Sequence, residues 1–133
     1  MFDLIISGGS VVDGSGSAMY RADVGINGEY VDAIGDLSSA QTARIIDATG
    51  LVISPGFIDT HVHTDAALLN EPQHESAIQM GVTTEVLGQD GLSYAPLSPE
   101  NYRMYSQYMS GLCGTPPQDL DMSTITSFRS HYH

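Results

Sequence analysis

At Pro55-Gly56 the sequence changes from short segments separated by glycine turns to a nearly continuous apolar segment. This change constrains the fold more than any other feature. Residues 56–63, GFIDTHVH, form a nearly continuous apolar segment of the kind found in strands that are buried on both faces of a parallel sheet. A short helix is expected over 71–80, because Gly81 suits the position just after a helix end. Residues 82–88, VTTEVLG, are again strand-like. We therefore predict one βαβ unit with two parallel strands.

The first fifty residues consist of short apolar segments that are separated by glycine-containing turns. The turns are expected at Gly8-Gly9, at Asn27-Gly28 and at Thr49-Gly50. An Asn-Gly pair between alternating segments is the strongest short-range signal for a β-hairpin. This pattern predicts a small antiparallel β unit. The whole chain is therefore expected to be α/β, with one domain over 1–54 and a second over 55–133.

Two further helices are expected after residue 91. Ser98 suits the N-cap and Pro99 the first turn of one helix, which Gly111 or Gly114 could terminate. Apolar side chains recur along this helix at spacings of three or four, which is typical of ordinary core packing; they are Tyr102, Tyr105, Met109 and Leu112. The segment 122–133 begins another helix.

The charge balance excludes some classes of partner. The chain has 16 acidic residues against four arginines and no lysine, which gives a formal net charge of -12. Nucleic acids and anionic membranes would repel such a chain, so neither is an expected partner. No apolar run reaches the roughly 18 residues that a membrane span needs, and the N-terminal segment has no basic region typical of a secretory signal. We therefore expect a cytoplasmic protein, in which the single Cys113 is an unreactive thiol.

Two histidines at the end of the first predicted parallel strand could bind a metal ion. Residues two apart in a strand point to the same face, so His61 and His63 should project together, with Asp59 one step back on that face. Paired imidazoles suit zinc, and also iron, nickel or copper, and Asp59 could orient one ring. A His-x-His triplet alone is a weak signal, since it also occurs for packing. Its position where a strand ends is typical of functional sites in parallel α/β folds.

Three carboxylates follow these histidines in the sequence. By alternation along 82–90, Asp90 emerges at the end of the second strand beside the histidines and could be a metal ligand, although Asp-Gly is also a common turn pair. Asp65 could contact substrate or cap the loop. Glu85 should lie on the face opposite Asp90, where a lone carboxylate would be costly, and the sequence predicts no partner for it.

Two segments resemble a known family. GLVISPGFIDTHVHTD, residues 50–65, resembles the signature of the amidohydrolase superfamily, whose members are metal-dependent hydrolases. GVTTEVLGQDGLSYAP, residues 81–96, is most similar to the N-acyl-D-amino-acid deacylases, or D-aminoacylases. The resemblance covers roughly 2–100. It implies that 1–54 are the N-terminal part of an accessory β-sandwich and that 55–133 are the first two strands and helices of an incomplete (β/α)₈ TIM-type barrel.

The resemblance also implies an activity and a set of site residues. The implied reaction is hydrolysis of a linear amide, in which an N-acyl-D-amino acid gives a D-amino acid and a carboxylate. His61 and His63 would bind one or two Zn²⁺ or another divalent metal, together with Asp90, which stands where family members commonly carry cysteine. Asp59 and Asp65 would act in the second shell or contact the substrate. The general base is expected beyond His133.

The length of the chain leaves alternatives to the deacylase interpretation. A complete barrel takes ~250 residues, so we expect the 133-residue chain to be an N-terminal portion that is inactive alone and needs the remainder of the barrel or an oligomer. One alternative is a cyclic amide hydrolase of the dihydroorotase or hydantoinase type. Another is a non-catalytic metal-binding or interaction fragment. Neither His74 nor the second His-x-His, His131 and His133, is expected to bind metal.

Overall fold

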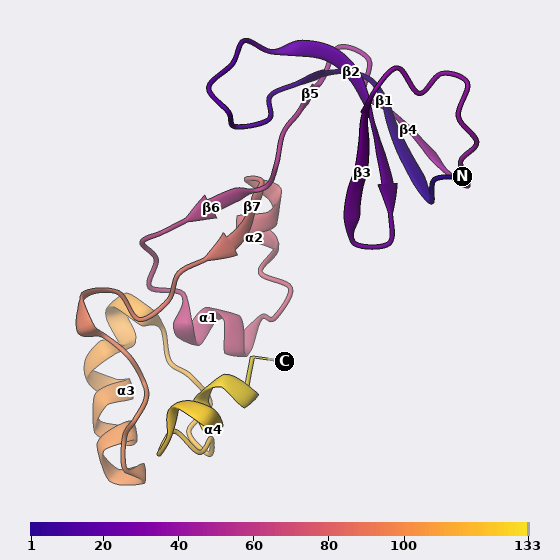
Figure 1. The fold of residues 1–133 in the computed structure, drawn as a ribbon. Coiled ribbons are helices and arrows are strands. Elements are labelled where there is room, and N and C mark those ends of the chain that lie inside the picture. The colour runs from indigo at the N-terminus through magenta and orange to yellow at the C-terminus, as the bar shows by residue number, and fades with distance from the viewer. Residues whose placement is uncertain (133) are drawn as a thin grey trace. The chain divides into compact units, whose positions relative to one another are not determined.

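The computed structural model describes residues 1–132, and the chain divides into two compact units (Figure 1). Unit 1 comprises Met1–Pro55 and unit 2 comprises Gly56–His133. Within the described residues, unit 1 consists of strands and loops, whereas unit 2 combines two strands with all of the helices. The predicted mixed α/β class is therefore confirmed. The predicted boundary lies one residue before the division between the units.

Unit 1 is a single five-stranded mixed sheet. Its strands are β1 (Leu4–Val11), β2 (Tyr20–Asn27), β3 (Tyr30–Gly35), β4 (Ile45–Asp47) and β5 (Val52–Ile53). The order is β3-β2-β1-β4, and β5 also pairs with β1. β1, β2 and β3 are antiparallel, but β4 and β5 run parallel to β1. The purely antiparallel prediction is therefore wrong for these two strands, because the chain between β3 and β4 returns so that β4 runs in the same direction as β1.

The glycines of unit 1 have two different roles. Gly8-Gly9 is not the predicted turn: β1 continues through it, and the pairing register with β2 shifts between Ile6 and Gly9. Gly8 has a φ of 73° and its amide donates a hydrogen bond of 2.8 Å to Asp23 Oδ1, which is typical of a β-bulge. The hairpin predicted at Asn27-Gly28 is confirmed, since Asn27 pairs with Tyr30 across a two-residue loop.

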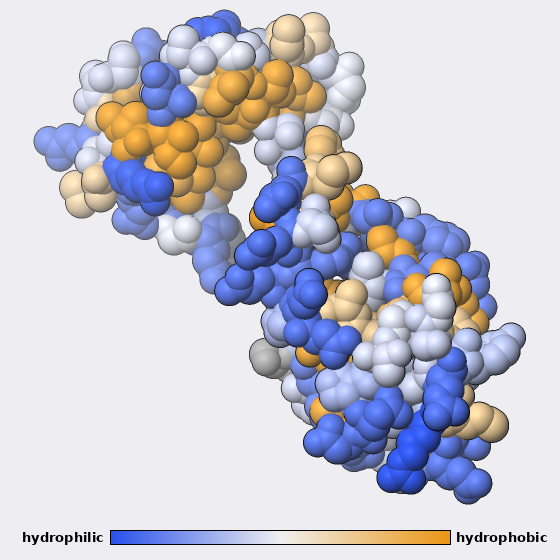
Figure 2. Space-filling view, turned by 180° about the vertical axis from the view of Figure 1, so that it is seen from behind, coloured by the Kyte–Doolittle hydropathy of each residue, from blue (hydrophilic) through white to orange (hydrophobic). Residues whose placement is uncertain are grey.

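One face of this sheet carries apolar side chains that remain open to solvent. Figure 2 shows apolar side chains gathered over unit 1. An apolar groove there is lined by Val24, Ile26, Val31, Ile34 and Ile53, among others. Val31 and Ile34 are 61% and 46% exposed. A sheet normally buries such a face against another layer, whereas within unit 1 this face stays partly exposed.

Unit 2 begins with the predicted parallel pair of strands. β6 (Phe57–Asp59) and β7 (Val82–Glu85) pair in parallel, and α1 (Asp65–Asn70) and α2 (Glu75–Gln79) lie between them along the chain. The βαβ prediction is thus confirmed: α2 lies within the helix expected over 71–80, and α1 is an additional helix before it. α2 is shorter than expected and ends at Gln79, with Met80 as the C-cap and Gly81, whose φ of 82° suits the residue after a helix end, next to it. No helix was expected over 65–70, because these residues follow the histidine pair and were assigned to its loop.

The strand expected over 56–63 is shorter and more exposed than the sequence predicts. β6 ends at Asp59, and Phe57 and Ile58 are 59% and 64% exposed. Burial on both faces requires further layers of structure. Within the part of the chain that the structure describes, β6 has β7 as its strand neighbour and no second one.

The remaining helices form the core of unit 2. α3 (Pro99–Cys113) begins as predicted at Ser98, whose side chain accepts a hydrogen bond from the amide of Asn101, and it ends at Gly114. α4 (Ile125–Ser130) follows. The buried cluster consists of Ala66, Tyr94, Tyr102, Met109, Cys113 and Met122. None of the helices within residues 1–132 is long and apolar enough to cross a bilayer.

The predicted apolar stripe of α3 is confirmed for three of its four members. Tyr102 and Met109 are buried and Tyr105 packs against them, but Leu112 is exposed. Cys113 takes the buried position instead. Burial raises the pKa of the Cys113 thiol, and the neighbouring Asp65 carboxylate acts in the same direction. Both effects disfavour the thiolate, in agreement with the expected lack of reactivity.

The close contact between Gly56 and β7 gives a test of this fold. A Cβ atom at Gly56 would overlap the side chain of Thr83, so Gly56→Ala should lower the free energy of unfolding by about 1–3 kcal/mol. Gly111 lies in α3 with open space around it, so Gly111→Ala should raise the free energy of unfolding by about 0.5–1 kcal/mol. Urea unfolding followed by far-UV circular dichroism measures both. Equal effects of the two substitutions would contradict the described packing.

Candidate metal centre

The candidate site lies where the two parallel strands end. The loop after β6 carries His61 and His63, and the loop after β7 carries Asp90. The amide of Val86 donates a hydrogen bond of 2.9 Å to the carbonyl of Asp59, which extends the pairing to the last residue of β6. Because the strands are parallel, both loops leave the same edge of the sheet.

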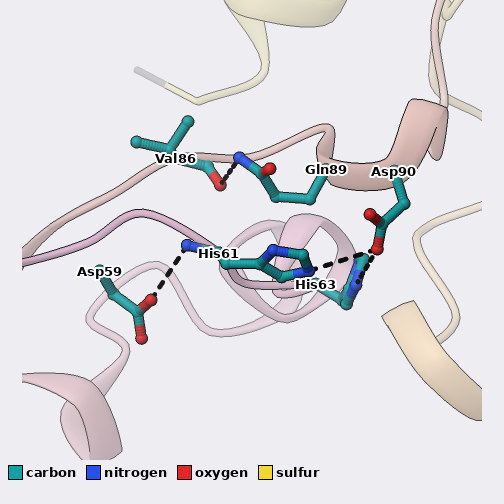
Figure 3. A network of polar contacts seen from close by, with 6 residues as sticks. All are labelled: Asp59, His61, His63, Val86, Gln89 and Asp90. Carbon is teal, nitrogen blue, oxygen red and sulfur yellow. Dashed lines mark hydrogen bonds and ion pairs between the residues drawn. The ribbon is translucent and has the colours of Figure 1, made fainter.

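Three donor atoms converge between these loops (Figure 3). Asp90 Oδ2 lies 3.2 Å from His61 Nε2 and 3.4 Å from His63 Nε2. The two imidazole rings are 5.4 Å apart between centroids and nearly perpendicular, at 82°. All three donor atoms lie within 4.8 Å of one another. The structure therefore brings together the three residues that the sequence proposed as metal ligands.

The histidines meet for a different reason from the one the sequence suggested. They lie beyond the end of β6, so the alternation of side chains along a strand does not align them. Instead, Asp59 Oδ1 accepts a hydrogen bond of 3.1 Å from the backbone amide of His61, and this contact shapes the turn after the strand. Asp59 was expected to orient a ring or to contact substrate. Its recorded contact is to the backbone, and the expected role stays a prediction.

Asp90 reaches the histidines from a tight left-handed turn rather than from a strand. It lies in a short 3₁₀ segment, η1 (Gln89–Gly91), and has a φ of 58° between Gly88 and Gly91, which both have a φ of 73°. The side chain of Gln89 supports the turn by donating to the carbonyl of Val86 at 3.1 Å. The two alternatives considered for Asp90 therefore coincide: it is a turn residue, and the turn directs its carboxylate at both imidazoles.

Asp65 is almost fully buried below this cluster. It is the first residue of α1 and is 1% exposed. Its carboxylate oxygens, like Nδ1 of His63, have no hydrogen-bond partner among residues 1–132. Burial raises the pKa of Asp65 above its usual value, while the neighbouring His63 acts in the opposite direction. Asp65 does not cap the loop, which corrects that expectation, and its second-shell or substrate role stays a prediction.

Glu85 has the partners that the sequence could not identify. Its Oε2 accepts a hydrogen bond of 2.6 Å from the hydroxyl of Thr64 and lies 3.4 Å from Nδ1 of His74. The side chains of Glu85 and His74 are only 11% and 14% exposed. The expectation that His74 is packed or solvent-facing rather than a metal ligand agrees with this position. No local sequence signal connects the three residues.

Of the second His-x-His, the structure describes His131, which is not a member of the cluster. His131 Nε2 lies 3.0 Å from the carbonyl of Asp121, near the end of α4. His133 lies outside the described residues. Among residues 1–132, the group of His61, His63 and Asp90 is the one whose donor atoms have metal-site spacing.

The donor set fits a divalent metal ion such as zinc. Two imidazole nitrogens and one carboxylate oxygen match the ligand types of catalytic zinc sites, which use three protein ligands and leave one position open. His61 and Asp90 are each 59% exposed at the side chain, so the site is accessible from solvent. His63 is 18% exposed and forms the inner side of the site.

Comparison with known proteins shows what this chain is similar to. D-aminoacylase of Alcaligenes xylosoxydans xylosoxydans is 39% identical over 130 residues, which cover 86% of this chain and 27% of that protein. N-acyl-D-glutamate deacylase of the same organism is 50% identical over 94 residues, covering 71% of this chain and 19% of that protein. The solved structure of N-acyl-D-glutamate deacylase from Bordetella bronchiseptica, complexed with zinc and a phosphonate inhibitor, has a TM-score of 0.68 at 38% identity, covering 71% of this chain and 20% of that chain.

The chain therefore spans about a fifth to a quarter of the length of the curated relatives that it matches. A sequence model of the Amidohydrolase family matches residues 44–130, which include all three donors of the candidate site. On this match, the chain belongs to the Amidohydrolase family.

Proposed function

We propose that this chain is the N-terminal portion of a metal-dependent hydrolase that converts an N-acyl-D-amino acid to a D-amino acid and a carboxylate. The observation that carries the proposal is the convergence of His61, His63 and Asp90 where two adjacent parallel strands end. The similarity to D-aminoacylase and to N-acyl-D-glutamate deacylase supports the substrate class.

His61 and His63 would hold the metal through Nε2, and Asp90 would hold it through Oδ2. When bound, zinc supplies Lewis acidity and lowers the pKa of a coordinated water to near neutrality, which suits attack on an amide carbonyl. The Asp59 carboxylate holds the backbone amide of His61, which would help to place the first imidazole at the metal. The single negative charge of Asp90 offsets part of the metal charge and leaves the site net positive towards a substrate carbonyl.

Asp90 also supplies the anionic ligand that this chain otherwise lacks. Some branches of the amidohydrolase superfamily use a carboxylated lysine as a bridging ligand, but the sequence has no lysine. A carboxylate has two oxygens and can therefore serve one metal or bridge two. We infer that the site holds one or two zinc ions and that Asp90 takes the place of the cysteine that deacylases commonly carry.

The rest of the proposed enzyme would complete both units. We propose that residues 1–54 are the first part of an accessory β-sandwich, which accounts for the uncovered apolar face of unit 1. Residues 55–133 would be the first two strands and helices of a (β/α)₈ barrel, which accounts for the exposure of Phe57 and Ile58. The general base and the contacts to the substrate carboxylate are expected from later barrel strands, so we expect the 133-residue chain to be inactive alone.

Zinc binding by the chain tests the metal site directly. Isothermal titration or chelator competition should detect zinc binding, and His63→Ala should weaken the affinity by more than about 100-fold, since even second-shell losses cost 10–100-fold. His61→Ala and Asp90→Ala should act in the same direction. His131→Ala is the control and should leave the affinity unchanged. Stoichiometric binding that persists in His61→Ala and His63→Ala together would refute the assignment.

The competence of the segment in a deacylase is tested by transplanting it into a relative. Residues 56–96 should replace the corresponding segment of the Alcaligenes D-aminoacylase with retention of N-acyl-D-amino acid hydrolysis. Asp90→Ala within the transplanted segment should abolish the activity. Assays with N-acyl-L-amino acids and with a hydantoin serve as controls. Hydrolysis of the hydantoin in preference to the acyl amino acid would favour a ring-opening enzyme, and zinc binding without any hydrolysis would favour a non-catalytic fragment.

A further inference from the structure

We propose that Glu85 is a positioning residue for the metal centre: its carboxylate holds Thr64, and with it His63, against the strand that leads to Asp90. The inference rests on the proposed metal-binding function and adds a residue to it. It concerns a side chain beneath the donors rather than a ligand.

The positions of Thr64 and Glu85 in the chain allow their contact to influence both loops that carry the donors. Thr64 directly follows His63 in the sequence, and Glu85 is the last residue of β7, shortly before the turn that carries Asp90. Glu85 also pairs with Asp59 in the strand register. A contact between Thr64 and Glu85 therefore ties the base of the histidine loop to the base of the aspartate loop.

The contact itself is short and protected from water. The Thr64 hydroxyl donates to Glu85 Oε2 at 2.6 Å, a length typical of strong hydrogen bonds to a carboxylate. Glu85 is only 11% exposed at the side chain, so its carboxylate depends on such partners. His74 Nδ1, 3.4 Å from the same oxygen, provides the second one. With Thr64 and His74 as partners, the Glu85 carboxylate is held in one position.

The second observation is that the Thr64 hydroxyl bonds to Glu85 and does not cap α1. Thr64 occupies the N-cap position of α1, yet its side chain makes no capping hydrogen bond. The hydroxyl residues at the N-caps of α3 and α4 behave differently: Ser98 accepts from the amide of Asn101, and Thr124 accepts from the amide of Ser127. Capping is the usual role of threonine at such a position. At Thr64 the hydroxyl is directed to Glu85 instead, so the contact to β7 replaces the local helix cap.

His74 adds a second contact between Glu85 and the crossover that joins β6 to β7. It precedes α2 and has a φ of 41°, which is uncommon for a residue other than glycine. Glu85 Oε2 thus contacts the crossover at two places, at Thr64 before α1 and at His74 between α1 and α2. Loss of the threonine hydroxyl should free the histidine loop from β7 while leaving the strand pairing in place.

Paired substitutions of Thr64 test the proposal on the complete chain. Thr64→Val keeps the shape of the side chain and removes the donor, and it should weaken zinc affinity by about 10–100-fold, the range for lost second-shell partners. Thr64→Ser retains the hydroxyl and should bind zinc almost as the parent does. Thr84→Val is the matched control, because Thr84 lies exposed on β7 and makes no side-chain hydrogen bond to residues 1–132.

A measurement without metal makes the test independent of zinc. The ring centroids of His61 and His63 lie 5.4 Å apart, so the metal-free chain should show a nuclear Overhauser effect between their ring protons. This signal should weaken in Thr64→Val and persist in Thr64→Ser and Thr84→Val. Far-UV circular dichroism checks that each variant is folded.

The outcomes separate this inference from the proposed function. Zinc binding and the ring signal that both stay unchanged in Thr64→Val would overturn the positioning role alone. Failure of Thr64→Ser to restore them, an equal loss in Thr84→Val, or absence of the ring signal in the parent chain would also overturn it. A parent chain that binds no zinc, but loses the ring signal only in Thr64→Val, would contradict the zinc site and support the positioning role.

Discussion

The parallel pairing of β6 with β7 is the constraint on which the candidate site depends. Parallel strands place their carboxyl ends at one edge of the sheet, so the loops that follow them leave the sheet side by side. Here the pairing extends to the last residue of each strand, where the amide of Val86 bonds to the carbonyl of Asp59. The histidine loop and the aspartate turn therefore start from neighbouring positions, and short turns are enough to bring their side chains together.

The site has two levels that differ in exposure and in role. The upper level holds His61 and Asp90, which are more than half exposed and are accessible to a metal ion and a substrate. The lower level holds Asp65 and Glu85, whose carboxylates are largely withdrawn from water. The Glu85 carboxylate contacts Thr64 and His74, whereas the Asp65 carboxylate has no hydrogen-bond partner within residues 1–132. A preorganised binding site needs supporting side chains that are themselves held in place, and the Glu85 carboxylate with its two partners meets that need.

The sequence pointed to the three residues that the structure brings together, but not to the way in which the chain brings them together. His61, His63 and Asp90 could be proposed because imidazole pairs and carboxylates at strand ends are recognisable from residue type and spacing. The alternation argument failed, because the strand ends at Asp59 and backbone turns complete the geometry.

Contacts between distant parts of the sequence were the least predictable features. The partners of Glu85 come from the crossover, where no local pattern marks Thr64 or His74 as neighbours of β7. The parallel direction of β4 and β5 was missed for the same reason, since a short apolar segment predicts a strand but not its pairing. The bulge at Gly8 was mistaken for a turn, because both features favour glycine.

X-ray absorption spectroscopy at the zinc edge of the zinc-loaded chain tests the central claim most directly. Coordination by His61, His63 and Asp90 predicts a first shell of nitrogen and oxygen only, at about 2.0–2.2 Å, with the outer-shell scattering of two imidazoles. The imidazole signal should halve in His63→Ala. A sulfur neighbour at about 2.3 Å, which would implicate Cys113, or a spectrum without imidazole scattering would contradict the account.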